Sequence, residues 1–229
     1  MGVNVVSKVE APALVAKRQG QIVRAAIALY GRHGYHATTV RDVARRARVS
    51  VGLIYQYVHD KEDVLYLALS EVLDSYQREI PPALAGRTDP MDRFCAAVRA
   101  YGRVIDARID ATVLVYRETK WLRRERREVI KGKELATNRL ISDCIDACVA
   151  ARLFAAVDVE LLTYQIVMFC HAWALKAWRF RHLMGIDEYV DRGLRLMLEP
   201  LVTRAGALRW RELAATPAAA RKRRASRAR

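Results

Sequence analysis

Helix-start signals are crowded into residues 39–63, and this constrains the fold more than any other feature of the chain. Thr39 with Asp42, and Asp60 with Asp63, have the spacing of a capping box, in which two side chains satisfy backbone N–H groups at the start of a helix. Ser50 lies between them and is a further N-cap residue. Three helix starts this close together require short helices joined by tight turns.

Four helices are therefore expected in the first 80 residues. They are predicted at 17–33, at 40–47, from Ser50 after a turn at 47–49, and from Asp60 to about Glu79. Gly34 followed by Tyr35 is typical of a left-handed C-cap with its hydrophobic contact, which ends the first helix. Residues 1–16 lack sustained periodicity and are expected to form a flexible N-terminal arm.

The segment from Ile80 to Pro90 contains three prolines and a glycine, which predicts the end of the fourth helix and a domain boundary. A smaller domain is expected at 17–80 and a larger helical domain at 81–204. Further helices are predicted near 91–108, 111–119, 121–152, 158–184 and 187–202. Residues 205–229, rich in Ala and Arg, are expected to form a disordered basic tail.

Composition supports an all-α fold. Hydrophobic residues make up 52% of the chain, whereas only 11 Gly and 6 Pro occur in 229 residues, which favours long helices over a turn-rich sheet protein. The formal net charge of +15 predicts attraction to polyanions. Six of the positive charges lie in the last 13 residues, so most of the excess belongs to the rest of the chain.

Cysteine usage and hydropathy favour a reducing cytoplasm. The four cysteines form no CxxC motif and no arrangement of metal ligands with nearby histidines, so no metal site is expected, although Cys144 and Cys148 share a helical face and leave a redox or metal pair open. The N-terminal residues lack the apolar core of a secretory signal. The longest uncharged run, Leu161 to Leu175, is shorter than the ~20 residues that cross a bilayer, so no membrane association is expected.

The stretch from Thr38 to Lys61 places two short helices around a three-residue turn. This is the arrangement in which the second helix enters a DNA major groove. Ala44 is small where the helices must cross closely, and Val43, Val49 and Ile54 supply apolar side chains that fix the crossing. The sequence therefore predicts an N-terminal three-helix helix-turn-helix DNA-binding domain.

This region resembles the TetR family of bacterial transcriptional regulators. The resemblance extends from about Ile22 to Leu65, while the rest of the chain is similar only in size and helical layout. It is carried by Gly34-Tyr35, Thr39, Val49-Ser50, Gly52, Ile54-Tyr55, Tyr57 and Lys61. Two departures are Arg48, where the family has glycine in the turn, and Val58, where it often has phenylalanine.

The resemblance implies roles for nine residues in DNA binding. Those with hydroxyl or ammonium groups at helix ends are expected to contact phosphates: Thr39, Ser50, Tyr55, Tyr57 and Lys61. Four others are expected to reach or approach base edges: Arg41, Val51, Gly52 and Gln56. The alternative is that the two tyrosines are core aromatics and Arg41 a solvated charge.

The resemblance also implies a larger C-terminal domain that dimerises and encloses a small-molecule cavity. The apolar stretch Leu161 to Met184 has more large side chains than one amphipathic stripe requires. With Tyr189, Leu194, Met197 and Leu198, it is expected to form a four-helix bundle across a two-fold axis. Such a homodimer would require a palindromic operator. The alternative is that both helices lie inside a monomer.

Effector contacts are expected in two groups. Cavity candidates are aromatic or polar-tipped residues, each of which could instead belong to the core: Tyr101, Tyr116, Trp121, Phe169, His171 and Trp173. The basic segment 117–133 is by default a solvated face. The sharper hypothesis is that it binds an anionic headgroup, such as the phosphates of an acyl-coenzyme A, through some of Arg117, Lys120, Arg123, Arg124 and Lys131.

The sequence thus predicts a ligand-responsive regulator of double-stranded operator DNA, with repression the commoner behaviour in the family. No GxSxG, HExxH, P-loop or GxGxxG motif is present, so neither catalytic residues nor a cofactor are expected. The basic tail leaves a sequence-nonspecific architectural DNA-binding protein as the alternative.

Overall fold

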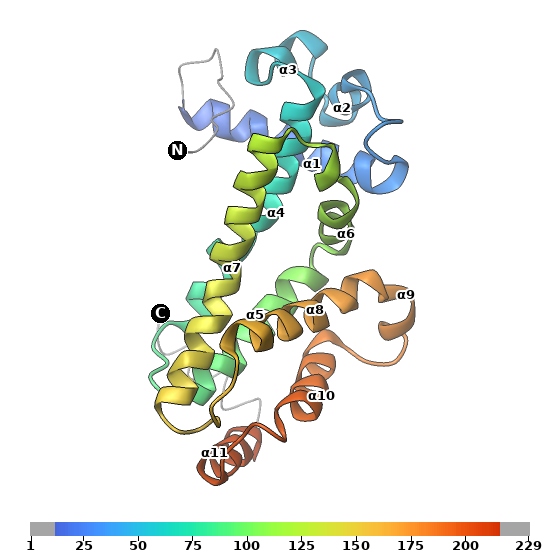
Figure 1. The fold of residues 1–229 in the computed structure, drawn as a ribbon. Helices are drawn as coiled ribbons and strands as arrows, with labels where there is room; N and C mark the ends of the chain where they lie inside the picture. Colours follow the sequence, from blue (N-terminus) through green and yellow to red (C-terminus); the bar gives the residue numbers. More distant parts are fainter. Residues whose placement is uncertain (1–11, 216–229) are drawn as a thin grey trace.

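The computed structural model describes the backbone of residues 12–215 and the side chains of residues 17–213, and this part is all-α (Figure 1). It contains no strand, apart from one isolated bridge between Phe154 and Val202. The elements are α1 (Pro12–His33), α2 (Val40–Ala47), α3 (Val51–Tyr57), α4 (Lys61–Leu84), α5 (Pro90–Asp106), α6 (Ile109–Glu118), η1 (Thr119–Trp121), α7 (Arg124–Ala150), α8 (Val159–Leu175), α9 (Ala177–Phe180), α10 (Ile186–Leu198) and α11 (Arg204–Ala215).

The N-terminal helices follow the predicted caps closely. Both expected capping boxes form, and Ser50 accepts a hydrogen bond from the Leu53 backbone N–H. Helix α1 begins at Pro12, so residues 12–16, expected in the arm, are helical. Proline is well suited to the first helical position because its missing N–H has no partner there.

Helix α4 does not end at the predicted prolines. It continues through Pro81 and Pro82 to Leu84, and both prolines are exposed. Each proline removes one helical hydrogen bond. The last turn is nevertheless retained because Ile80 and Leu84, one turn apart, are buried in the core of the larger domain.

Two further differences lie near the C-terminal end. The predicted helix 158–184 is divided into α8 and α9, because Lys176 leaves helical geometry with φ −122° and ψ 29°. Residues 205–215, expected in the tail, belong to α11, whose start is capped by the Thr203 hydroxyl as it accepts from the Gly206 N–H at 3.1 Å. Gly206 packs so closely on the Leu153 carbonyl that a Cβ atom would lie 1.9 Å from its oxygen. Residues 216–229 lie outside the described part.

Two hydrophobic cores share their helices. The smaller core joins α1–α4 but also takes Leu114 from α6, Leu122 after η1 and Ile130 from α7. The larger core is built from α4, α5, α6, α7, α8 and α10. Because α4, α6 and α7 contribute to both cores, a displacement of these helices in the larger domain is transmitted directly to the smaller one.

Candidate DNA-binding surface and effector region

Helices α2 and α3 pack as a crossed pair. Val43, Ala44 and Ile54 are buried between them, as the spacing predicted. The turn is closed by Arg48, which has the left-handed angles φ 56° and ψ 47° and donates its backbone N–H to Ala44 and Arg45. A side chain in this conformation costs about 1 kcal/mol. The departure from glycine is therefore tolerated without changing the turn.

The outer surface of α2 and α3 carries most of the predicted DNA contacts. Arg41, Ser50, Gly52 and Gln56 are exposed, Val51 is half-buried, and the side chain of Tyr55 is 46% exposed. The Thr39 hydroxyl is already engaged, because it donates to the Asp42 carboxylate at 2.6 Å and accepts from the Asp42 N–H at 3.1 Å.

Tyr57 is the exception, and the expectation that it lies exposed on this surface is wrong. Its side chain is only 1% exposed and belongs to the smaller core. The reason is helical spacing: Tyr57 lies three residues after the buried Ile54 and therefore on the same face of α3. Tyr55, one residue after Ile54, is rotated away from that face.

Lys61 lies at the start of α4 and has protein partners. Its ammonium group donates to the His36 carbonyl at 3.1 Å and lies 4.4 Å from the centre of the Tyr35 ring. Burial lowers the pKa of this group. Lys61 thus anchors the 34–37 loop to α4.

Three arginines that the sequence reasoning left out extend the basic surface of α2. Arg45, Arg46 and Arg48 are exposed beside Arg41, and of these only Arg45 pairs with an acidic residue of the described part, Asp42. A groove of about 410 Å³ separates the end of α1 from α2. Its lining includes Leu29, His33, Thr38, Arg45 and Arg46. The sequence already indicated this basic surface, because four of the nine residues 40–48 are arginines.

In the larger domain, the structure brings together three of the predicted effector residues. His171 of α8 lies between two tyrosines, with its Nε2 3.1 Å from the Tyr101 hydroxyl and its Nδ1 2.6 Å from the Tyr116 hydroxyl. The Tyr116 hydroxyl also donates to the Met168 sulfur at 3.3 Å. Burial lowers the pKa of His171 to about 4, so the imidazole is neutral at pH 7. We call Tyr101, His171 and Tyr116 the Tyr-His-Tyr cluster.

The other three cavity candidates lie elsewhere. Trp173 is buried and donates to the Asp106 carboxylate at 2.9 Å, while Phe169 stacks on Tyr189 with ring centres 4.5 Å apart. Trp121 is exposed and packs edge-on against His36 at 4.2 Å, at the contact between the two domains. These three side chains do not join the Tyr-His-Tyr cluster.

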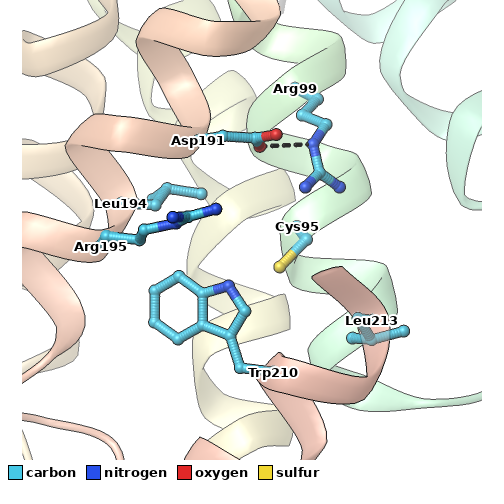
Figure 2. Close-up of a pocket in the computed structure, with 7 residues that line it drawn as sticks. All are labelled: Cys95, Arg99, Asp191, Leu194, Arg195, Trp210 and Leu213. Atoms are coloured by element: carbon cyan, nitrogen blue, oxygen red, sulfur yellow. Dashed lines mark hydrogen bonds and ion pairs between the residues drawn. The ribbon is translucent and has the colours of Figure 1, made fainter. Parts of the chain in front are cut away.

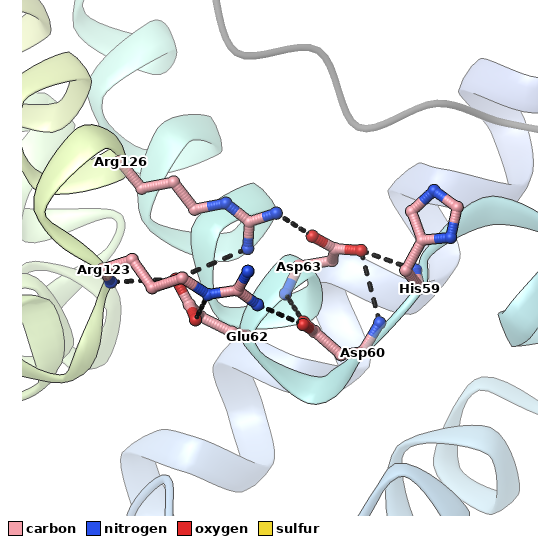
Figure 3. Close-up of polar contacts among 6 residues, drawn as sticks. All are labelled: His59, Asp60, Glu62, Asp63, Arg123 and Arg126. Atoms are coloured by element: carbon pink, nitrogen blue, oxygen red, sulfur yellow. Dashed lines mark hydrogen bonds and ion pairs between the residues drawn. The ribbon is translucent and has the colours of Figure 1, made fainter.

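The basic segment at the start of α7 is partly occupied by ion pairs (Figure 3). Arg123 pairs with Asp60 and with Glu62, and Lys131 pairs with Glu128 on its own helix. Arg117, Lys120 and Arg124 are exposed and form no ion pair among the described residues, although the charge of Arg124 acts on Glu128, one turn further along α7. Lys120 lies 5.1 Å from the centre of the Trp121 ring.

A second arginine, Arg126, makes a buried contact between the domains that the sequence did not predict. It pairs with Asp63, whose side chain is 1% exposed, and lies 3.6 Å from Glu62 (Figure 3). Asp63 also accepts from the His59 N–H at 2.5 Å and from the Asp60 N–H at 3.3 Å. Burial acts to raise the pKa of Asp63, but these hydrogen bonds and Arg126 outweigh it and lower the pKa. One carboxylate therefore caps α4 and binds α7.

Large apolar side chains lie uncovered on and around α8–α10. Trp178 is 72% exposed and Leu196 81% exposed. Four other large apolar side chains are exposed to a smaller extent: Leu161, Met168, Leu175 and Leu183. These exposed side chains are not the ones that the sequence predicted on α10 for a bundle across a two-fold axis. Of the predicted residues, Tyr189, Leu194 and Leu198 are buried within the protomer and Met197 is half-buried.

A small cavity of about 70 Å³ lies between α5, α10 and α11 (Figure 2). Arg99 donates to Asp191 at 2.7 Å on one side of it, and Arg195 reaches across above Trp210. Buried Cys95 forms part of the wall. Trp210 and Leu213 of α11 line this cavity and pack against the larger core.

The described residues contain neither a cluster of metal ligands nor a membrane-spanning helix. No group of three or more His, Cys, Asp or Glu side chains is placed to hold a metal ion within residues 12–215. Among the helices of the same part of the chain, none combines the length and apolar character that a membrane span requires.

Comparison with known proteins agrees with this geometry. The chain matches the family model described as bacterial regulatory proteins, tetR family, over residues 22–67, and the model described as tetracyclin repressor-like, C-terminal domain, over residues 87–175. It is 50% identical over 203 residues to the HTH-type transcriptional regulator HbdR of Aromatoleum sp. (strain CIB), which covers 89% of each chain.

Solved structures share the fold at lower identity. A tetR-family regulatory protein from Rhodococcus RHA1 has a TM-score of 0.72 and 23% identity, covering 80% of this chain and 96% of its own. AibR, solved in complex with isovaleryl coenzyme A and operator DNA, has a TM-score of 0.68 and 16% identity, covering 78% and 97%. The model matches and the identity to HbdR decide the assignment: the chain belongs to the TetR family of bacterial transcriptional regulators.

Proposed function

We propose that this protein is a cytoplasmic, homodimeric repressor that binds a palindromic operator and is released from it by a small molecule. The observation that carries the proposal is the exposed basic surface of α2 and of the turn before α3, the recognition helix, with Arg41, Arg45, Arg46 and Arg48 all exposed. Arginines at this density neutralise phosphates and read guanine in the major groove.

Within this surface we assign two roles. Ser50 and Tyr55 contact phosphates, together with the N-terminal N–H groups of α3, while Arg41 and Gln56 reach base edges and Gly52 permits close approach of the backbone. Thr39 and Lys61 act mainly by holding α2 and the 34–37 loop in place, because their polar atoms already have protein partners.

The second copy of the chain is proposed to cover the exposed apolar side chains around α8–α10. Side chains as large and as exposed as Trp178 and Leu196 mark a protein interaction site when they occur together on one surface. A two-fold dimer through this face would space its recognition helices about 34–36 Å apart, one turn of DNA.

The effector is proposed to bind against the Tyr-His-Tyr cluster. Its class, an acyl-coenzyme A or another lipid-like anion, is supported by the exposed Arg117, Lys120 and Arg124 near the cluster and by the ligand of the structural neighbour AibR. Arg117 directly follows Tyr116 in α6, so a member of the cluster and an exposed cation are neighbours on one helix. Because α4, α6 and α7 belong to both cores, a shift at the cluster would displace the DNA-binding domain.

Footprinting tests the proposal. Fragments selected from genomic DNA are expected to show one protected palindrome, and addition of an acyl-coenzyme A is expected to remove the protection at constant salt. Uniform protection along every fragment would instead identify a sequence-nonspecific architectural protein. Retention of the footprint with all acyl-coenzyme A thioesters would reject that effector class and leave the operator assignment standing.

A further inference from the structure

A buried amide in the middle of α7 has no hydrogen-bond partner. Asn138 is 5% exposed, and neither its side-chain oxygen nor its side-chain nitrogen has a partner among the described residues. Leaving a buried polar group unsatisfied costs about 1–3 kcal/mol. A polar partner from outside the described fold, a water molecule or a ligand, would remove this cost.

Asn138 lies in the middle of α7, which packs against α8, the helix that carries His171 of the Tyr-His-Tyr cluster. Glu134 lies one turn before it, and its charge acts on the hydroxyls of Tyr101 and Tyr116. Ile141 follows it by three residues and is fully buried in the larger core. Asn138 thus shares the inward face of α7 with Glu134 and adds an amide to the groups around the cluster.

The charge of these groups limits what can bind there. His171 is neutral at pH 7, since burial lowers its pKa to about 4, and Glu134 has no ion-pair partner among the described residues. Burial raises the pKa of the Glu134 carboxyl. A ligand carboxylate at the depth of Asn138 would therefore be buried beside Glu134 and a neutral imidazole, whereas the cations Arg117 and Lys120 are exposed at the surface.

We propose that Asn138 hydrogen-bonds a neutral polar group of the effector, such as an amide or thioester carbonyl or a hydroxyl, and that the cluster rejects free carboxylates. This inference rests on the effector response proposed above and gives it a chemical class. An acyl thioester meets the requirement, because its carbonyl is neutral while its phosphates remain at the surface near Arg117 and Lys120. The corresponding free acid does not.

Calorimetry with matched probes tests the preference. The full-length protein at pH 7.5 is titrated with phenylacetamide against phenylacetate and with hexanamide against hexanoate. For at least one pair, the amide is expected to bind at least tenfold more tightly than its acid. Equal or tighter binding by both acids overturns the inference, and so does the absence of heat from both amides at 5 mM. Operator binding measured on the same preparation keeps that failure distinct from failure of the regulator assignment.

Substitution of Asn138 tests the residue. Asn138→Leu is expected to weaken the amide at least tenfold while the melting temperature stays equal or rises, because no unsatisfied amide remains buried. Asn138→Ala, expected to show the same loss of affinity, serves if the leucine variant does not fold. Thr137→Val is the control, since Thr137 is equally buried but donates to the Lys133 carbonyl at 3.0 Å, and it should keep the preference. Unchanged amide affinity in the Asn138 variants overturns the assignment.

Discussion

At the scale of single residues, two neighbouring tyrosines in α3 separate DNA contact from folding. Tyr55→Ala is expected to weaken operator and nonspecific DNA binding while leaving the free energy of unfolding within about 0.5 kcal/mol, because its side chain is half exposed. Tyr57→Ala removes a fully buried ring and should cost about 3–5 kcal/mol of stability. Fluorescence anisotropy and urea unfolding measure the two effects. Equal loss of stability in both variants would contradict the assigned positions.

His171 gives the larger domain a specific pH dependence. Its folded pKa of about 4 lies below the ordinary value of 6.5, so the unfolded chain binds the proton more tightly. Stability contributed by the neutral imidazole is therefore complete above pH 6.5 and falls as the pH drops toward 4, by about 3 kcal/mol in total. Urea unfolding between pH 7.5 and 4.5 is expected to show this slope in the wild type and a smaller one in His171→Gln. The other four histidines are exposed.

At the scale of helices, local signals predicted the fold where neighbours in sequence decide the structure. The bounds of α2 and α3 depend on caps such as Thr39 and Ser50, which act within three residues, so they could be read from the chain. The continuation of α4 past Pro81 and the formation of α11 depend on distant contacts, such as Gly206 on Leu153. No local pattern encodes these.

The effector cluster and the contact between α4 and α7 also depend on residues that are distant in sequence. Tyr101, Tyr116 and His171 lie 55 to 70 residues apart at their contacts, and the family resemblance was needed to group them. The pairing of Arg126 with Asp63 could not be predicted, because several arginines precede and follow Arg126 and any of them could have met the carboxylate.

That pairing predicts how strongly α7 and α4 are coupled. Arg126→Met leaves Asp63 buried without its cation and is expected to cost about 3–5 kcal/mol. Arg123→Met is the matched control, because the Arg123 side chain is itself exposed and its loss should destabilise the protein far less. Urea unfolding at pH 7 distinguishes the two variants. Similar small losses would mean that the buried pair does not hold the helices together.

The lowered pKa of Asp63 adds a second test at the same contact. The stability that the ionised carboxylate contributes is complete above the ordinary pKa of 3.8 and is lost as the pH falls through the lower folded value. Asp63→Asn should therefore be less stable than the wild type at pH 6, and the difference should shrink below pH 3.8. A constant difference across this range would contradict the assigned charge.

At the scale of the whole molecule, the apolar surface around α8–α10 determines whether one chain can act alone. Half an operator offers a single chain half the contacts, whereas a two-fold dimer binds both halves with one rigid spacing. In the dimer proposed above, the basic surfaces of two copies would therefore bind a palindromic operator. Helices α8–α10 lie at the other end of the molecule from α2 and α3 (Figure 1), so exposed residues on them can be changed without altering the proposed DNA contacts.

Leu196→Glu together with Trp178→Glu is expected to yield a folded monomer with the helical circular dichroism of the wild type, because both side chains are exposed in the protomer. The charges would be buried unpaired in a dimer, at a cost that exceeds what such an interface gains. Light scattering coupled to gel filtration measures the mass, and DNA titration should show loss of the full palindrome but residual salt-sensitive binding. Leu208→Glu on α11 is the control, since Leu208 is also exposed but lies outside this surface, and it should remain dimeric. A dimeric double variant would place the interface on another face and require a different spacing of the recognition helices.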